Sequence, residues 1–167
     1  KLNWLNGLWI RESLTTEKLA DQLTAWALNR DNLLAVLPHV QTRMDTLSDF
    51  IPKTAFLVSG QLTITEADFT ALKLDTSKQV KILQFCLWRF ESLNDWHRDA
   101  LFTELSGLAE ALELKLKDFL APLFIAVAGT TASFSVMDAM VLLGSDMTRA
   151  RLRHAIEALG GVSKKQM

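Results

Sequence analysis

The stretch APLFIAVAGTTASFSVMDAMVLLG, residues 121–144, carries the clearest evidence of the fold class. Two apolar runs flank a turn of small and polar residues. Each run is followed by a glycine, Gly129 or Gly144, and glycine readily adopts the left-handed conformation that ends many α-helices. The stretch therefore predicts two helices joined by the segment GTTASFS, residues 129–135, which is called the 129–135 loop below.

Apolar residues recur at helical spacing through most of the remaining chain. The segments with this pattern are residues 15–28, 33–51, 76–93, 94–114 and 147–161. Residues 33–51 carry an apolar stripe that should face the core, made of Val36, Val40, Met44, Leu47 and Ile51. No pair of segments alternates as paired β-strands do, so we predict an all-α helical bundle.

The segment VSGQLTITEADF, residues 58–69, interrupts the helical pattern. It contains a glycine, a short β-like alternation and the sequence TEAD, which has the form of a capping box. We place a subdomain boundary near residues 58–65. This boundary divides the chain into two helical subdomains, residues 1–60 and residues 61–167.

The composition is that of a well-packed globular protein, with 49% apolar and 22% charged residues. No run of about 18 uncharged apolar residues occurs, so we expect no membrane span. The single cysteine, Cys86, excludes an internal disulfide and indicates a buried thiol in a cytoplasmic protein. The chain begins without an initiator methionine or a secretory signal, which is what a fragment of a larger protein would show.

Signatures of catalysis and metal binding are missing from the sequence. The histidines, His39, His97 and His154, have no metal-ligand spacing, and one cysteine cannot build a structural zinc site. No phosphate-binding loop, dinucleotide fingerprint or nucleophile elbow is present. We therefore predict no catalytic residue and no metal site. The net charge of −1 counts against a nucleic-acid binder, although arginines and lysines outnumber acids from Arg149 onward.

Three stretches, in order along the chain, resemble bacterial glutamyl-tRNA synthetases. KLNWLNGLWIRE (residues 1–12) resembles the KL-x-W-x-N-x-x-Y/W-I-R pattern that follows the catalytic half of that family. LLAVLPHVQTRMDTLSDF (residues 33–50) is similar to the family's helix containing R-x-x-T-L. Residues 112–152 resemble the closing pattern, in which PLRvAlTG leads to an sP turn, a helix ending in LLG, and then RL.

The resemblance implies the fold and task of the family's C-terminal anticodon-binding region. That region is an α-helical cage that holds the tRNA anticodon loop, and the 129–135 loop would lie beside splayed anticodon bases. Small residues allow close approach of the backbone, hydroxyl groups can bind bases, and Phe134 can stack on a base. The helix that begins near Ser135 would offer free N–H groups to an anion. In the alternative interpretation, Phe134 packs inward on its own helix.

Individual positions match the family unequally. Phe124 stands where the family has the arginine of PLR, and phenylalanine can stack but cannot form forked hydrogen bonds. Phe134 replaces the proline of sP, and Arg43 falls on the arginine of R-x-x-T-L or is an ordinary surface arginine. Arg149 and Arg153 share one helix face and contact either phosphate or solvent. The residues expected to bind nucleic acid are Arg43, Phe124, Thr130, Ser133, Phe134, Val136, Met137, Arg149 and Arg153.

The resemblance further implies that the full-length enzyme attaches glutamate to tRNA(Glu), and to tRNA(Gln) in a non-discriminating form, using ATP and Mg²⁺. The HIGH and KMSKS signatures of that chemistry are absent here, so this fragment should need no cofactor and should bind without catalysing. Its other partner would be the enzyme's own catalytic domain, within a monomer. The alternatives are the C-terminal domain of a class I lysyl-tRNA synthetase and a helical protein-interaction module that has lost RNA reading.

Overall fold

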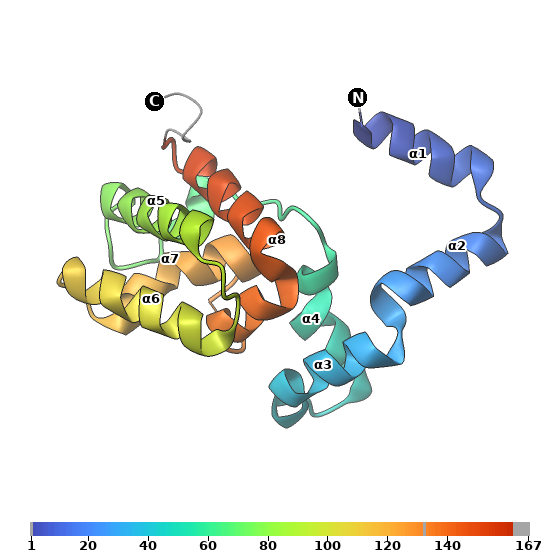
Figure 1. Cartoon of the computed structure of the whole chain (residues 1–167), viewed down its shortest axis with the longest axis horizontal. Coiled ribbons are helices and arrows are strands. Elements are labelled where there is room, and N and C mark those ends of the chain that lie inside the picture. The colour runs from blue at the N-terminus through green and yellow to red at the C-terminus, as the bar shows by residue number, and fades with distance from the viewer. Residues whose placement is uncertain (1, 132, 162–167) are drawn as a thin grey trace. The chain divides into compact units, whose positions relative to one another are not determined.

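Helices make up the chain in the computed structural model, which describes residues 2–131 and 133–161 (Figure 1). No strand occurs in these residues, which confirms the predicted all-α class. The α-helices are α1 (Leu2–Ser13), α2 (Thr16–Leu23), α3 (Arg30–Val40), α4 (Phe50–Val58), α5 (Thr76–Ser92), α6 (Arg98–Ala111), α7 (Leu116–Ala128) and α8 (Val136–Ala158). Short helical turns occupy Thr24–Leu28, Gln41–Arg43, Leu47–Asp49 and Glu66–Phe69. In the described part, no helix has the length and apolar character needed to cross a membrane.

The chain divides into two compact units, residues 1–38 and residues 39–167. Residue 60, where we place the boundary between the two functional subdomains, lies inside the second unit because α4 packs on α7 and α8. The division into a junction subdomain and an anticodon-binding subdomain therefore stays a prediction about function.

The first unit has no buried side chain among its described residues. Its helices instead expose large apolar side chains, which are Leu2, Trp4, Leu5, Trp9, Ile10, Leu23, Trp26, Leu28 and Leu34. Isolated short helices are only marginally stable in water and usually depend on packing of an apolar face. These helices therefore have an apolar face that nothing within the unit covers.

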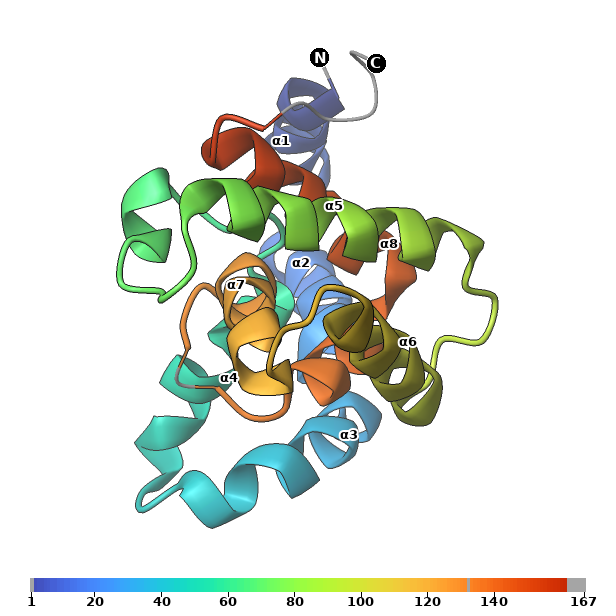
Figure 2. The same cartoon turned by 90° about the vertical axis from the view of Figure 1, so that its left-hand side faces the viewer.

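The core of the second unit lies among α5, α6, α7 and α8, and Figure 2 shows α6 and α7 side by side next to α5. Its largest fully buried apolar side chains come from these helices and from the turn before α5. They are Phe69, Ile82, Leu83, Leu87, Phe90, Leu101, Leu105, Phe119, Leu123, Met140 and Leu152. Burying an aliphatic or aromatic side chain of this size stabilises a fold by about 1.5 to 3 kcal/mol.

The glycines that follow the two apolar runs of residues 121–144 end helices as predicted. Gly129 has φ = 72° and ψ = 6°, and its N–H donates to the carbonyl of Ile125 at the end of α7. Gly144 has φ = 79° and ψ = 165°, a conformation that essentially only glycine adopts, and it breaks α8 into two helical segments. The first segment of α8 therefore ends at the glycine, where the sequence pattern predicts an end.

The helix predicted over residues 33–51 is interrupted in the structure. Val40 is fully buried, whereas Leu47 is 91% exposed and Ile51 is 62% exposed, so the expected buried stripe is wrong beyond Val40. The cause is local, because the Asp49 carboxylate accepts hydrogen bonds from the backbone N–H groups of Asp45 and Thr46. Such side chain–backbone bonds compete with continuation of a helix.

Candidate functional site

The 129–135 loop connects the end of α7 to the start of α8, and all its residues except Ala132 are described. Thr130 and Thr131 are exposed, so the loop presents two threonines on the surface. At the start of α8, the Ser135 hydroxyl accepts the N–H of Asp138 at 3.4 Å, and the Asp138 carboxylate lies in the first turn. A negative charge already occupies the positive end of this helix dipole, so the expected free N–H site for an anion is not supported.

Phe134 packs inward, which is the alternative to base stacking. Its side chain is only 4% exposed. The ring lies at 5.4 Å from that of His39, nearly parallel at 23°, and at 5.6 Å from that of Phe56, tilted by 42°. Because the rings of His39 and Phe56 pack against it, the ring of Phe134 has no open face on which a base could stack in this structure.

The other apolar candidates also lie below the surface. Val136 is 1% exposed and Met137 is 8% exposed, so both support the loop from beneath in this structure. Neither side chain presents an accessible surface to a ligand here, so their part in nucleic-acid binding stays a prediction. Phe124 is half-buried in α7 and keeps part of its ring surface accessible.

Arg43 is far from the 129–135 loop in the sequence, but the fold places its side chain against the loop. Its Nη1 donates to the carbonyl oxygen of Ser133 at 3.0 Å, although the two residues are 90 positions apart. The hydroxyl oxygen of Ser133 is buried and has no hydrogen-bond partner among the described residues. A buried hydroxyl without a partner carries a free-energy cost, and because this oxygen is inaccessible in this structure, no ligand contacts it unless the loop moves.

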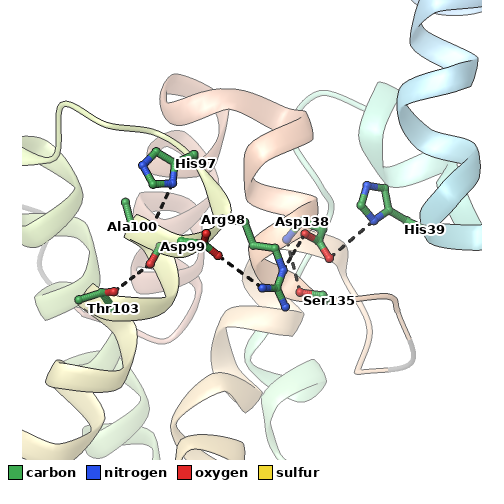
Figure 3. A network of polar contacts seen from close by, with 8 residues as sticks. All are labelled: His39, His97, Arg98, Asp99, Ala100, Thr103, Ser135 and Asp138. Atoms are coloured by element: carbon green, nitrogen blue, oxygen red, sulfur yellow. Dashed lines mark hydrogen bonds and ion pairs between the residues drawn. The ribbon is translucent and has the colours of Figure 1, made fainter.

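A polar network beside the loop links three helices, and no motif in the sequence points to it (Figure 3). Asp138 of α8 lies at its centre. One carboxylate oxygen is 3.6 Å from Nδ1 of His39, and the other is 3.2 Å from Nε of Arg98 at the start of α6. Figure 3 shows His39 and Arg98 approaching Asp138 from opposite sides. These two contacts connect the first turn of α8 to the end of α3 and to the start of α6.

Arg149 and Arg153 lie beside the C-terminal end of α5. Nη1 of Arg149 donates to the carbonyl of Phe90 at 3.1 Å, and its Nη2 contacts the Asp146 carboxylate at 2.6 Å. Nη2 of Arg153 is 3.7 Å from the Glu91 carboxylate. Both guanidinium groups therefore contact protein groups in this structure.

Outside the loop, a surface hollow of about 660 Å³ lies between α5 and α6. Its lining residues are Phe85, Trp88, Arg89, Ser92, Thr103, Glu104, Gly107, Leu108 and Ala111, with an ion pair between Arg89 and Glu104. Cys86 is fully buried, and burial raises the pKa of its thiol far above the usual range. Within the described ranges, no group of three or more His, Cys, Asp and Glu side chains is placed to hold a metal ion.

Comparisons with known proteins agree with the motifs. The model of the family described as "Anticodon binding domain" matches residues 18–156. The glutamate–tRNA ligase of Saccharophagus degradans is 60% identical over 165 residues, which are 99% of this chain and 33% of that protein. The glutamate–tRNA ligase of Cellvibrio japonicus is 58% identical over 166 residues, again 99% of this chain and 33% of that protein. The chain thus spans about a third of the length of the curated relatives it matches.

A solved structure shares the fold. It is the crystal structure of a glutamate tRNA ligase from Elizabethkingia meningosepticum in complex with its amino acid. The match has a TM-score of 0.69 at 21% identity and covers 78% of this chain and 26% of that one. The family match and the identity to these ligases confirm the resemblance drawn from the three motifs. The chain belongs to the anticodon-binding domain family and corresponds to the C-terminal part of glutamate–tRNA ligases.

Proposed function

We propose that this chain binds the anticodon loop of tRNA(Glu) and does so through the 129–135 loop together with Arg43. The observation that carries the proposal is the hydrogen bond between Arg43 and the Ser133 carbonyl. The resemblance connects both the R-x-x-T-L helix and the TG…sP turn with the anticodon. These two elements are far apart in the sequence, and the fold places them in contact.

The chemistry of the surface suits single-stranded RNA. Splayed bases of an RNA loop are recognised by hydrogen bonds to their edges and by stacking. Thr130 and Thr131 are exposed, so their hydroxyl groups are available at the surface of the loop. The exposed guanidinium of Arg43 carries five N–H donors, of which the Ser133 carbonyl takes one. The remaining donors can bind a base edge or a phosphate while the loop stays attached.

Phe124 and the two later arginines have smaller parts in the proposed interface. A half-buried phenylalanine can stack on a base at its exposed face, but it cannot replace the forked hydrogen bonds of the family's arginine. Arg149 and Arg153 would have to exchange their present carboxylate contacts for phosphate. We therefore assign base discrimination to Arg43 and the loop rather than to these three residues.

The activity of the whole protein would come from the part of the ligase that this chain does not include. By resemblance, that part activates glutamate with ATP and Mg²⁺, and no described residue of this chain is assigned to bind either one. The contribution of this chain would be positional, because holding the anticodon fixes where the acceptor end of the tRNA enters the active site. The resemblance also supports a monomeric cytoplasmic enzyme and makes tRNA(Gln) the second RNA to test.

The first unit would dock on the catalytic part of the same ligase. Its described helices expose nine large apolar side chains and bury none of their residues. Exposed apolar surface of this extent is typical of interaction sites. The relatives are about three times longer than this chain, and in a protein of that length the catalytic part would be the partner that covers this surface.

The test is binding of the chain to tRNA(Glu) and to a transcript with an altered anticodon, over a series of salt concentrations. Phosphate contacts weaken as salt increases, whereas base contacts produce a difference between the two transcripts. We expect at least a tenfold difference, about 1.4 kcal/mol. Equal binding of both transcripts would reduce the proposal to backbone recognition. Absence of binding at low salt would favour the protein-interaction module, to which the replacement of the family's arginine by Phe124 also points.

A further inference from the structure

Arg151 is a charged side chain in the core of the second unit. It belongs to the second segment of α8, it is 1% exposed, and it is the largest of the fully buried side chains. Burial in apolar surroundings lowers the pKa of its guanidinium to about 10, so the group stays charged at neutral pH. A buried charge is retained only where hydrogen-bond partners compensate for the lost water.

Backbone carbonyl oxygens provide this compensation. Nη1 donates to Val127 at 2.5 Å, Nη2 donates to Phe56 at 2.5 Å, and Nε donates to Gly60 at 2.9 Å. Val127 lies in the last turn of α7, and Phe56 lies in the last turn of α4. Carbonyls in a last turn have no partner inside their helix and carry the negative end of its dipole. The guanidinium of Arg151 therefore caps the C-terminal ends of both α4 and α7.

Both helix ends lead to the 129–135 loop. The carbonyl of Val127 is held two residues before Gly129, where the loop begins. Phe56 contributes the ring on which Phe134 packs. A Cβ atom at Gly129 would lie 3.6 Å from Leu62, so the segment after Gly60 also approaches the loop. Arg151 thus holds the base of the loop and the helix that supports it.

We propose that Arg151 is a positioning residue for anticodon discrimination, which sets the conformation of the 129–135 loop without contacting RNA. The inference rests on the proposed function. The planar guanidinium reaches three carbonyls in different directions, whereas a lysine presents all its donors from a single nitrogen. Arg151→Lys therefore keeps the charge but loses part of the connection between the ends of α4 and α7.

The experiment compares Arg151→Lys with Leu105→Ala in this chain. Leu105 is a fully buried residue of α6, so its truncation weakens the core without removing any bond near the loop. Circular dichroism first establishes a temperature at which both variants are folded. The measured quantity is the ratio of affinities for tRNA(Glu) and for the anticodon-altered transcript. We expect Arg151→Lys to reduce this ratio about tenfold, and Leu105→Ala to leave it unchanged.

Two results would overturn the inference, namely an unchanged ratio in Arg151→Lys or an equal reduction in both variants. Hydrogen exchange of the backbone amides, measured without RNA, separates the inference from the proposed function. Faster exchange at Gly129, Thr130 and Ser133 in Arg151→Lys alone would show that Arg151 sets the loop even if the unaltered chain fails to discriminate. In that case the proposed function fails and the positioning of the loop stands. Equal exchange in both variants refutes the positioning itself.

Discussion

Replacing Phe134 by alanine separates the two interpretations of this residue, a support of the loop and a platform for a base. In the structure the ring is 4% exposed and packs on the rings of His39 and Phe56. Truncation of a buried phenylalanine to alanine costs about 3 to 5 kcal/mol of unfolding free energy. For a unit of this size, the melting temperature should decrease by roughly 10 to 20 °C.

Phe134→Leu is the matched control for this experiment. Leucine keeps most of the apolar volume, so it should cost less than about 1.5 kcal/mol, yet it removes the aromatic face on which a base would stack. Thermal and urea unfolding measure stability, and tRNA affinity is measured below the melting transition of every variant. We expect a large loss of stability in Phe134→Ala and near-normal affinity in Phe134→Leu. The reasoning is refuted if both variants keep their stability and lose about 1 to 3 kcal/mol of binding free energy, as removal of a stacked base would produce.

Further predictions concern three other residues. Arg43→Gln should reduce the affinity for tRNA about tenfold, as measured by filter binding. The free energy of unfolding in urea should change by less than about 1 kcal/mol, because the side chain is exposed. A loss of stability without a loss of affinity would contradict the assignment. The Cys86 thiol should remain unreactive toward a thiol reagent at pH 8 in the folded chain and react after unfolding, because burial raises its pKa; rapid labelling of the native chain would contradict this. Backbone N–H donors from Thr46 and Asp45 hold the pKa of Asp49 below its usual value of 3.8. The contribution of Asp49 to stability should therefore be complete above about pH 4 and disappear as the pH falls through the lowered pKa. Unfolding curves of Asp49→Asn against pH measure this, and an equal acid dependence in both proteins would refute it.

Part of the candidate site is predictable because it depends on short-range rules. The 129–135 loop and its bounding helices follow from two apolar runs, a glycine that tolerates positive φ, and a serine that caps α8. The TEAD sequence likewise produces the capping box between Thr65 and Asp68. Each feature involves residues within about one helical turn, so its energy is determined locally.

Other parts of the site required the folded structure. Apolar spacing alone does not separate the exposed Leu47 and Ile51 from buried Val40, and the hydrogen bonds of Asp49 that interrupt the helix became evident only in the structure. The network around Asp138 joins residues from α6, α8 and the end of α3, and the sequence order of these elements does not predict their proximity. Helical periodicity identifies an apolar face but does not specify which neighbour covers it.

The sequence by itself determined the all-α class, the glycine-ended helices around the 129–135 loop, and the likeness to glutamyl-tRNA synthetases. These properties depend on local dihedral preferences and on motifs read along the chain. Only the tertiary structure decided that Phe134 faces inward, that Arg43 holds Ser133, and that Arg151 is buried. The physical reason is distance along the chain, because Arg43 meets Ser133 across 90 positions and Arg151 meets Gly60 across 91. Contacts of that range form only when the whole core packs.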